Sequence, residues 1–251
     1  MPKDRGIEKF DRYFGSFTKI IAEQIKKKGK VKILDAGCGY GVAMMGFVKR
    51  FGEKVEIIGF NYSKHDGNLK KMKQQAIEKE IFSKKELPKI KNMPKFVYCD
   101  ASKKLPFKDN SFDFIYSMAS VYLYDDKIHF LEECNRILKK KGMARISVAF
   151  WPHFQNKKGF PSKYYEMWEI WNKGKEIKAH NYCKKIKGIK VVGKNNDSKQ
   201  YLEIKKQSKL DFKLQFVSSI DYNFLWKEWG GVKSIYTTQK KGTFVPKYRK
   251  K

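Results

Sequence analysis

An acidic residue followed by three evenly spaced glycines is the part of the chain best suited to hold a ligand. Asp35 directly follows the apolar residues Val31, Ile33 and Leu34, which predict a buried parallel strand. The glycines come at every second position after it, at Gly37, Gly39 and Gly41. They allow a ligand to approach bare backbone, and the amphipathic segment from Val42 predicts a helix whose free N–H groups point back at the turn. A strand, a glycine turn and a helix in this order predict a site for a nucleotide-type cofactor.

The place of the acid within this pattern distinguishes two kinds of cofactor site. A dinucleotide-binding turn follows G-x-G-x-x-G, whose third glycine would fall at Val42. Here the pattern is D-x-G-x-G-x-G, which resembles motif I of the class I S-adenosylmethionine (SAM)-dependent methyltransferases, in a methyltransferase type 11-like domain. The Asp35 carboxylate suits SAM, because SAM carries a cationic sulfonium and ammonium where a dinucleotide carries an anionic pyrophosphate. A glycine-rich surface turn is the alternative.

Two further strand ends follow in the order in which this family places its motifs. Residues 55–60 predict a buried strand that ends at Asn61. The resemblance implies that this position binds the ribose hydroxyls of SAM. The family usually has an acid here, and asparagine keeps one acceptor and one donor without the charge. Residues 95–99 predict the next strand, which ends at Asp100 and Ala101, and the resemblance implies that the Asp100 carboxylate accepts a hydrogen bond from the adenine amino group.

A fourth strand completes the resemblance. Residues 105–118 contain Leu-Pro-Phe and Asp-Asn-Ser-Phe-Asp, which are similar to the LPF…DNSFDxIxS stretch of the same superfamily. The resemblance covers residues 31–150 well and the remainder loosely, and these later motifs argue against a mere surface turn. It implies that SAM is the cofactor, bound by the following residues: Asp35, Gly37, Gly39, Gly41, Asn61, Asp100, Ala101 and Ser117.

The elements that position these residues follow from the same family. We expect an α/β fold: a Rossmann-like, seven-stranded, mostly parallel sheet with helices on both faces, an antiparallel C-terminal hairpin and a cap insertion after strand five. One methyltransferase domain would fill residues 1–251, with an N-terminal helix (1–30), a SAM-binding core (31–150), a cap (151–200) and a part that completes the sheet (201–251). The apolar pattern predicts helices over 67–83, 126–140 and 201–210, and strands over 143–150, 212–218 and 232–238.

Catalytic residues are harder to identify, because the methyl group on a sulfonium is already activated and an in-line approach of the acceptor suffices. The Asn/Asp-Pro-Pro-Tyr signature of amino-group methylation is absent. His153, Tyr122 and Tyr124 follow strands five and four at the edge where open sheets bind ligands, so they are candidates for catalysis or acceptor contacts. Tyr124 is alternatively a core residue. The aromatic side chains at 151–200 either pack on the sheet or line an acceptor pocket.

The composition indicates which kinds of partner the protein could bind. The formal net charge is +30, almost all of it from lysine, since arginine occurs at only six positions. Either the surface binds a polyanion such as RNA, or the lysines reflect an AT-rich genome; nucleic-acid sites favour arginine. No apolar run is long enough to span a bilayer, and the first residues lack the apolar core of a signal peptide. The four cysteines lack metal-ligand spacing, so we expect no metal and a reduced, cytoplasmic protein.

Two classes of function remain. The first is a SAM-dependent methyltransferase with a small-molecule or lipid-like acceptor, supported by the aromatic cap and by residues 59–63, which resemble the G-x-N-x-S form of sterol and cyclopropane-fatty-acid type enzymes. An RNA acceptor is a variant of this hypothesis, supported by the charge. The second class is a catalytically degenerate SAM-binding subunit, for which the missing acid at Asn61 is the hint.

Overall fold

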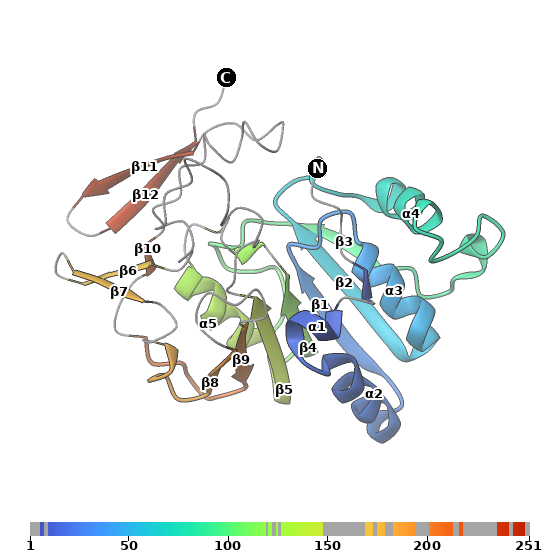
Figure 1. Cartoon of the computed structure of the whole chain (residues 1–251), viewed down its shortest axis with the longest axis horizontal. Coiled ribbons are helices and arrows are strands. Elements are labelled where there is room, and N and C mark those ends of the chain that lie inside the picture. Colours follow the sequence, from blue (N-terminus) through green and yellow to red (C-terminus); the bar gives the residue numbers. More distant parts are fainter. Residues whose placement is uncertain are drawn as a thin grey trace.

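A seven-stranded sheet forms the centre of the computed structural model (Figure 1). The structure describes residues 6–7, 10–118, 120–121, 124, 127–147, 183–193 and 201–212, and the backbone of 169–172, 175–178, 216–217, 235–240 and 243–248. The strands of the sheet are β1 (Val31–Ala36), β2 (Val55–Asn61), β3 (Lys95–Tyr98), β4 (Phe112–Ser117), β5 (Leu138–Ser147), β8 (Ile189–Val192) and β9 (Tyr201–Lys205).

The strand order is β3-β2-β1-β4-β5-β9-β8. Strands β1 to β5 run parallel to one another, β9 runs antiparallel to β5, and β8 runs antiparallel to β9. The predicted α/β class, the mostly parallel seven-stranded sheet and its antiparallel C-terminal hairpin are therefore confirmed. The order reverses between β1 and β4, which is the point where open α/β sheets bind their ligands.

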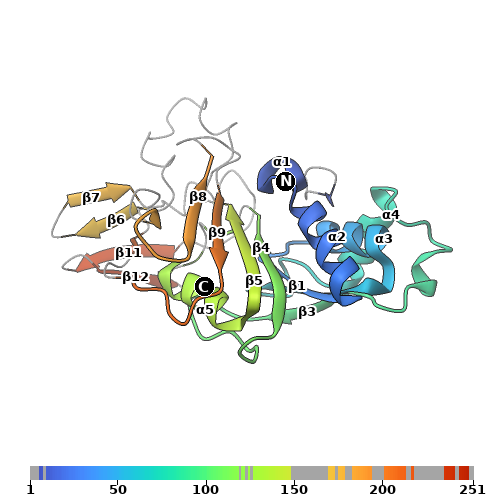
Figure 2. The same ribbon diagram turned by 90° about the horizontal axis from the view of Figure 1, so that it is seen from below.

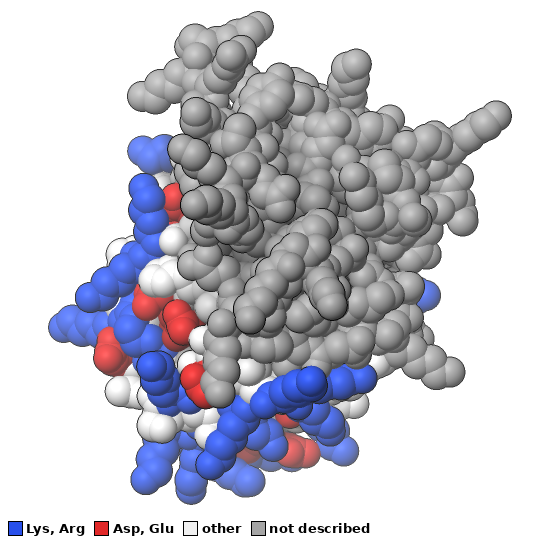
Figure 3. Space-filling view, turned by 90° about the vertical axis from the view of Figure 1, so that its left-hand side faces the viewer, with Lys and Arg blue, Asp and Glu red and all other residues white. Residues whose placement is uncertain are grey.

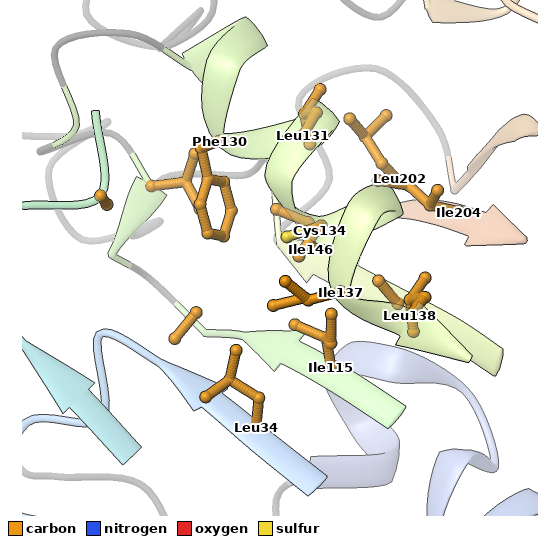
Figure 4. Close-up of a cluster of buried hydrophobic side chains, with 14 of the residues drawn as sticks. Leu34, Ile115, Phe130, Leu131, Cys134, Ile137, Leu138, Ile146, Leu202 and Ile204 are labelled. Carbon is orange, nitrogen blue, oxygen red and sulfur yellow. The ribbon is translucent and has the colours of Figure 1, made fainter. Parts of the chain in front are cut away.

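Helices cover both faces of the sheet, because successive strand residues point to opposite sides. On one face lie α1 (Phe10–Phe14), α2 (Phe17–Lys28), α3 (Val42–Phe51) and α4 (Leu69–Glu78), and on the other lies α5 (Lys127–Ile137) (Figure 2). Two short 3-10 helices, Gly52–Lys54 and Leu87–Lys89, precede β2 and β3. Ile33 of β1 packs in the cluster under α1–α4, whereas its neighbour Leu34 packs with Phe130 and Ile137 of α5 (Figure 4). The α4 and α5 helices are shorter than the predicted ranges 67–83 and 126–140.

The helix predicted over 201–210 is wrong, because this segment contains β9. Leu202 and Ile204 pack in the α5-side cluster, while Tyr201 packs in the cluster on the opposite face. Alternation between two faces is the pattern of a strand. Glu203 belongs to the same strand and, although it is charged, the residue is only 8% exposed.

The hairpin that completes the sheet is formed by β8 and β9, not by the predicted strands at 212–218 and 232–238. Within those two ranges the structure has β10 (Phe216–Val217) and part of β11 (Ile235–Lys240). Strand β10 pairs with β6 (Glu169–Asn172), which pairs with β7 (Lys175–Lys178), and β11 pairs with β12 (Thr243–Tyr248). These pairs form two separate small sheets. The predicted strand over 143–150 corresponds to β5, whose described part ends at Ser147.

A buried ion pair ties the N-terminal helices to the sheet. Arg145 of β5 lies opposite Glu203 of β9, and its Nη2 and Nε atoms donate to Glu203 Oε2 at 2.6 and 3.0 Å. The two residues are 6% and 8% exposed. Arg145 Nη1 also donates to the carbonyls of Phe14 and Gly15, between α1 and α2, and the guanidinium lies over the Phe17 ring. The Arg145 side chain therefore joins β5 and β9 to the bend between α1 and α2.

Within the described part of the chain, no helix combines the length and the hydrophobicity needed to cross a membrane.

Candidate cofactor site

The glycine turn lies where β1 ends and α3 begins, beside the point of strand-order reversal. All three glycines have left-handed backbones, with φ of 72° at Gly37, 54° at Gly39 and 79° at Gly41. Residues with a Cβ atom rarely adopt this conformation, so the turn requires glycine at each of these positions. Gly41 is also the N-cap of α3, whose first N–H groups face the turn.

Backbone hydrogen bonds hold this turn against the end of β2. The N–H groups of Gly37 and Cys38 both donate to the carbonyl of Phe60, at 3.0 and 3.1 Å. The N–H of Gly41 donates to the carbonyl of Cys38 at 2.9 Å. The turn is therefore a fixed part of the sheet edge, which leaves it preorganised for a ligand.

Asp35 is a buried acid at the end of β1, with 4% of its surface exposed. Its Oδ2 atom accepts a hydrogen bond of 2.8 Å from the hydroxyl of Tyr116. The Tyr116 ring is itself buried, with the rings of Phe10 and Phe47 at 4.6 and 5.6 Å. Charges interact more strongly in such apolar surroundings than in water, so this carboxylate is suited to a cationic ligand. Tyr116 was not predicted as a site residue, since in the sequence it is one more apolar position of a buried strand.

Asn61 lies at the end of β2 and is 4% exposed. Its side-chain oxygen accepts a hydrogen bond from the N–H of Gly39, and its side-chain nitrogen donates to the carbonyl of Gly39, both at 2.9 Å. Asn61, the residue predicted to bind the ribose, therefore lies beside the glycine turn, and both ends of its side-chain amide are bonded to that turn.

Asp100 and Ala101 follow β3 at the same edge. The backbone N–H of Cys99 donates to the carbonyl of Asn61 at 3.0 Å, which places the end of β3 beside the end of β2. The Asp100 carboxylate accepts a hydrogen bond of 2.8 Å from the N–H of Ser102, and Ala101 is buried. Burial raises the pKa of the Cys99 thiol to about 12, so this cysteine is a neutral packing residue.

Ser117 is buried at the end of β4 and begins a chain of hydroxyl groups. Ser120 donates to the carbonyl of Ala36 at 2.8 Å. A hydroxyl has one hydrogen to donate, so Ser117 donates to Ser120, at 2.5 Å. A Cβ atom on Gly37 would lie 2.3 Å from that of Ser120. The first glycine of the turn therefore also makes room for the segment that follows β4.

Tyr124 is partly buried and packs against the core beside these hydroxyl groups. Its ring lies 4.8 Å from that of Phe130 and 6.3 Å from that of Phe60, and its hydroxyl lies 3.3 Å from Ser120 Oγ. Burial raises the pKa of the phenol far above its usual value, so Tyr124 stays protonated at neutral pH. This placement favours the core alternative over a catalytic base. Tyr122 and His153, the other candidates, lie outside the described residues.

Known proteins resemble part of this chain. The family described as a methyltransferase domain matches residues 34–146. The sterol 24-C-methyltransferase ERG6B of Gibberella zeae is 30% identical over 139 residues, which are 55% of this chain and 33% of that protein. The demethylmenaquinone methyltransferase of Staphylococcus aureus strain MRSA252 is 30% identical over 126 residues, 50% of this chain and 46% of that protein. The chain thus spans less than half the length of these curated relatives.

Among solved structures, the CMeT domain of the citrinin polyketide synthase is similar to this chain with a TM-score of 0.50 and 18% identity, over 79% of this chain and 55% of that one. At this identity, the likeness concerns the fold alone.

Proposed function

We propose that this chain, which matches the methyltransferase domain family over residues 34–146, uses SAM to transfer a methyl group to a small-molecule or lipid-like acceptor. One observation carries the proposal: a buried carboxylate, Asp35, adjoins a left-handed glycine turn at the switch point of the sheet.

The described side chains fit SAM in charge and in shape. When bound, SAM supplies an activated methyl group. Asp35 would favour the cationic end of the cofactor, and the bare backbone from Gly37 to Gly41 would allow it to approach closely. Asp100 would accept a hydrogen bond from the adenine amino group. The chain then has to orient the acceptor in line with the methyl group and exclude water, and neither task needs a strong acid or base.

The sequence relatives favour an apolar acceptor. The names of these two relatives specify a sterol and a demethylmenaquinone. Residues 59–63 of this chain, Gly-Phe-Asn-Tyr-Ser, form the end of β2 and the segment after it, and Gly59 makes room there for the side chains of Cys38 and Met44. The names of these relatives and the Gly-Phe-Asn-Tyr-Ser segment support a small-molecule or lipid-like acceptor over a nucleic acid.

The acceptor is tested by incubating the protein with SAM labelled in the methyl group and with separate lipid, small-molecule, protein and RNA fractions of a cell extract. We expect label in the lipid or small-molecule fraction, and none when the variant Gly39→Val replaces the wild type. Label confined to RNA would overturn the acceptor class. Binding of SAM without transfer to any fraction would support a catalytically degenerate subunit instead.

The lysine-rich surface favours RNA as the second candidate acceptor. Lys184, Lys185, Lys187 and Lys205 are exposed around β8 and β9, and among the described residues none of them forms an ion pair with an acid. Figure 3 shows basic side chains gathered on the described part of the face that includes this hairpin. RNA binding through these lysines would weaken linearly in log affinity against log salt. RNA binding that persists at physiological salt, and methylation that falls when the four lysines are replaced, would favour this candidate.

The adenine role of Asp100 gives a quantitative prediction. Asp100→Ala is expected to weaken SAM binding by about 1.5–3 kcal/mol, the range for a hydrogen bond to a charged group. Asp100→Asn keeps an acceptor for the Ser102 N–H and should lose less. Asp109→Ala is the matched control, since Asp109 precedes β4 and lies at the opposite edge of the sheet. Calorimetry measures all three, and unchanged affinity in a folded Asp100→Ala protein would remove Asp100 from the site.

A further inference from the structure

Asn61 is bonded to one residue through both ends of its side-chain amide. Its Oδ1 atom accepts from the N–H of Gly39 and its Nδ2 atom donates to the carbonyl of Gly39, each at 2.9 Å. Gly39 has a left-handed backbone, and Asn61 is almost fully buried. The pair of bonds therefore fixes the orientation of both peptide groups on either side of the central glycine of the turn.

The segment around Gly67 lies close to the same carbonyl group of Gly39. A Cβ atom on Gly67 would lie 1.8 Å from the carbonyl oxygen of Gly39 and 2.9 Å from Asn61 Nδ2, so only glycine fits at this position. The carbonyl of Gly67 in turn accepts a hydrogen bond of 3.2 Å from the hydroxyl of Tyr98, at the end of β3. Gly39 is thus enclosed between the end of β2 and the segment that leads to α4.

The chemistry of this arrangement requires an amide. A side-chain amide can accept from an N–H and donate to a carbonyl at once, whereas an ionised carboxylate can only accept. An aspartate at position 61 would place an acceptor oxygen against the Gly39 carbonyl, in a site with little water to screen the repulsion. The acid usual in the family and the asparagine of this chain are therefore not equivalent here.

We propose that Asn61 is a positioning residue: it holds the backbone of Gly39 in the conformation that receives SAM, and it does not bind the ribose. The inference rests on the proposed function for the identity of the ligand, but the clamp itself exists without ligand. This role would account for the asparagine at a position where the family usually has an acid.

The first test needs no ligand. Hydrogen exchange of the Gly39 amide, followed by NMR in the full chain, should be faster by about tenfold or more in Asn61→Ala than in the wild type, because the N–H loses its acceptor. The matched control is Asn68→Ala. Asn68 caps α4 by accepting from the N–H of Lys71 at 3.1 Å, so this variant should accelerate exchange at Lys71 and leave Gly39 unchanged. Unchanged Gly39 exchange in folded Asn61→Ala would overturn the clamp.

The second test uses the isosteric variant Asn61→Asp, which keeps the proposal falsifiable if Asn61→Ala does not fold. At neutral pH its SAM affinity should fall by about tenfold or more, since the donor to Gly39 is lost. A protonated carboxyl group again offers one donor and one acceptor. Burial beside the Gly39 carbonyl would raise the pKa of the new carboxyl group above its usual value of about 3.9, so the deficit relative to the wild type should shrink as the pH is lowered from about 8 to about 5. A ribose-binding acid predicts the opposite: equal or tighter binding at neutral pH and a loss on acidification.

The third test asks whether the side chain senses the ribose. S-adenosylhomocysteine and its 2′-deoxy analogue are titrated into the wild type and Asn61→Ala. We expect the same fold loss for both ligands, and a loss that vanishes with the deoxy ligand would assign Asn61 to the ribose. Failure of the proposed function is separate from these outcomes, because a wild type that binds neither ligand can still show the exchange difference at Gly39.

Discussion

Replacing Gly39 with valine is expected to abolish SAM binding while the protein stays folded. Gly39 has φ of 54°, where a β-branched residue is strongly disfavoured. Strain of this kind costs about 1–3 kcal/mol, and the new side chain would also occupy the space through which the cofactor approaches the backbone. We expect a loss of about 100-fold or more in affinity, which corresponds to about 3 kcal/mol.

Gly52→Val is the matched control for this variant. Gly52 also has a left-handed backbone, with φ of 58°, but it follows α3 and a Cβ atom there would meet open space. The control should lose a similar amount of stability and keep the SAM affinity of the wild type. Isothermal calorimetry and thermal unfolding measure the two effects. Wild-type affinity in a folded Gly39→Val protein would refute the assignment of the turn.

Removing the guanidinium of Arg145 is expected to have the largest effect on stability. Arg145→Met leaves the Glu203 carboxylate buried without its ion-pair partner, and it leaves the carbonyls of Phe14 and Gly15 without their donor. Breaking a buried pair on one side costs about 3–5 kcal/mol. Equilibrium unfolding in urea should show this loss.

Two further variants test whether the unpaired buried charge of Glu203 causes the loss of stability. Arg145→Met combined with Glu203→Leu should recover part of the loss, since no unpaired charge remains. Lys49→Met breaks the half-exposed ion pair with Glu86, of 2.7 Å, and should cost at most about 1 kcal/mol. A loss of unfolding free energy below about 1 kcal/mol in Arg145→Met would show that the Arg145–Glu203 pair does not hold the α1–α2 bend to the sheet.

The sequence allowed the cofactor half of the fold to be predicted because its signals are local. The apolar runs of β1, β2 and β4 each end at a polar residue, and the left-handed turn after β1 requires glycines at fixed spacing. Parallel strands place their carboxyl ends at one edge, so Asp35, Asn61 and Asp100 could be assigned to one site before their contacts were known.

The features that escaped prediction depend on partners far away in the chain. Glu203 can be buried in β9 because Arg145 lies opposite it and donates to its carboxylate, and the spacing of residues 201–210 carries no sign of that partner. Tyr116 is a site residue because the register of β1 and β4 places its hydroxyl at Asp35. The bonds between Asn61 and Gly39 likewise arise from the packing of the turn on β2, so the residue type alone suggested a ligand contact.

We expect the turn after β1 to bind SAM and not a dinucleotide. The measurement that tests it most directly is calorimetric titration of the folded wild-type chain with SAM and, in parallel, with NAD. We expect saturable binding of SAM at one site per chain and no binding of NAD, since Asp35 disfavours a pyrophosphate and Val42 stands where the dinucleotide pattern has its third glycine. Binding of NAD, or the absence of SAM binding by the folded protein, would contradict it.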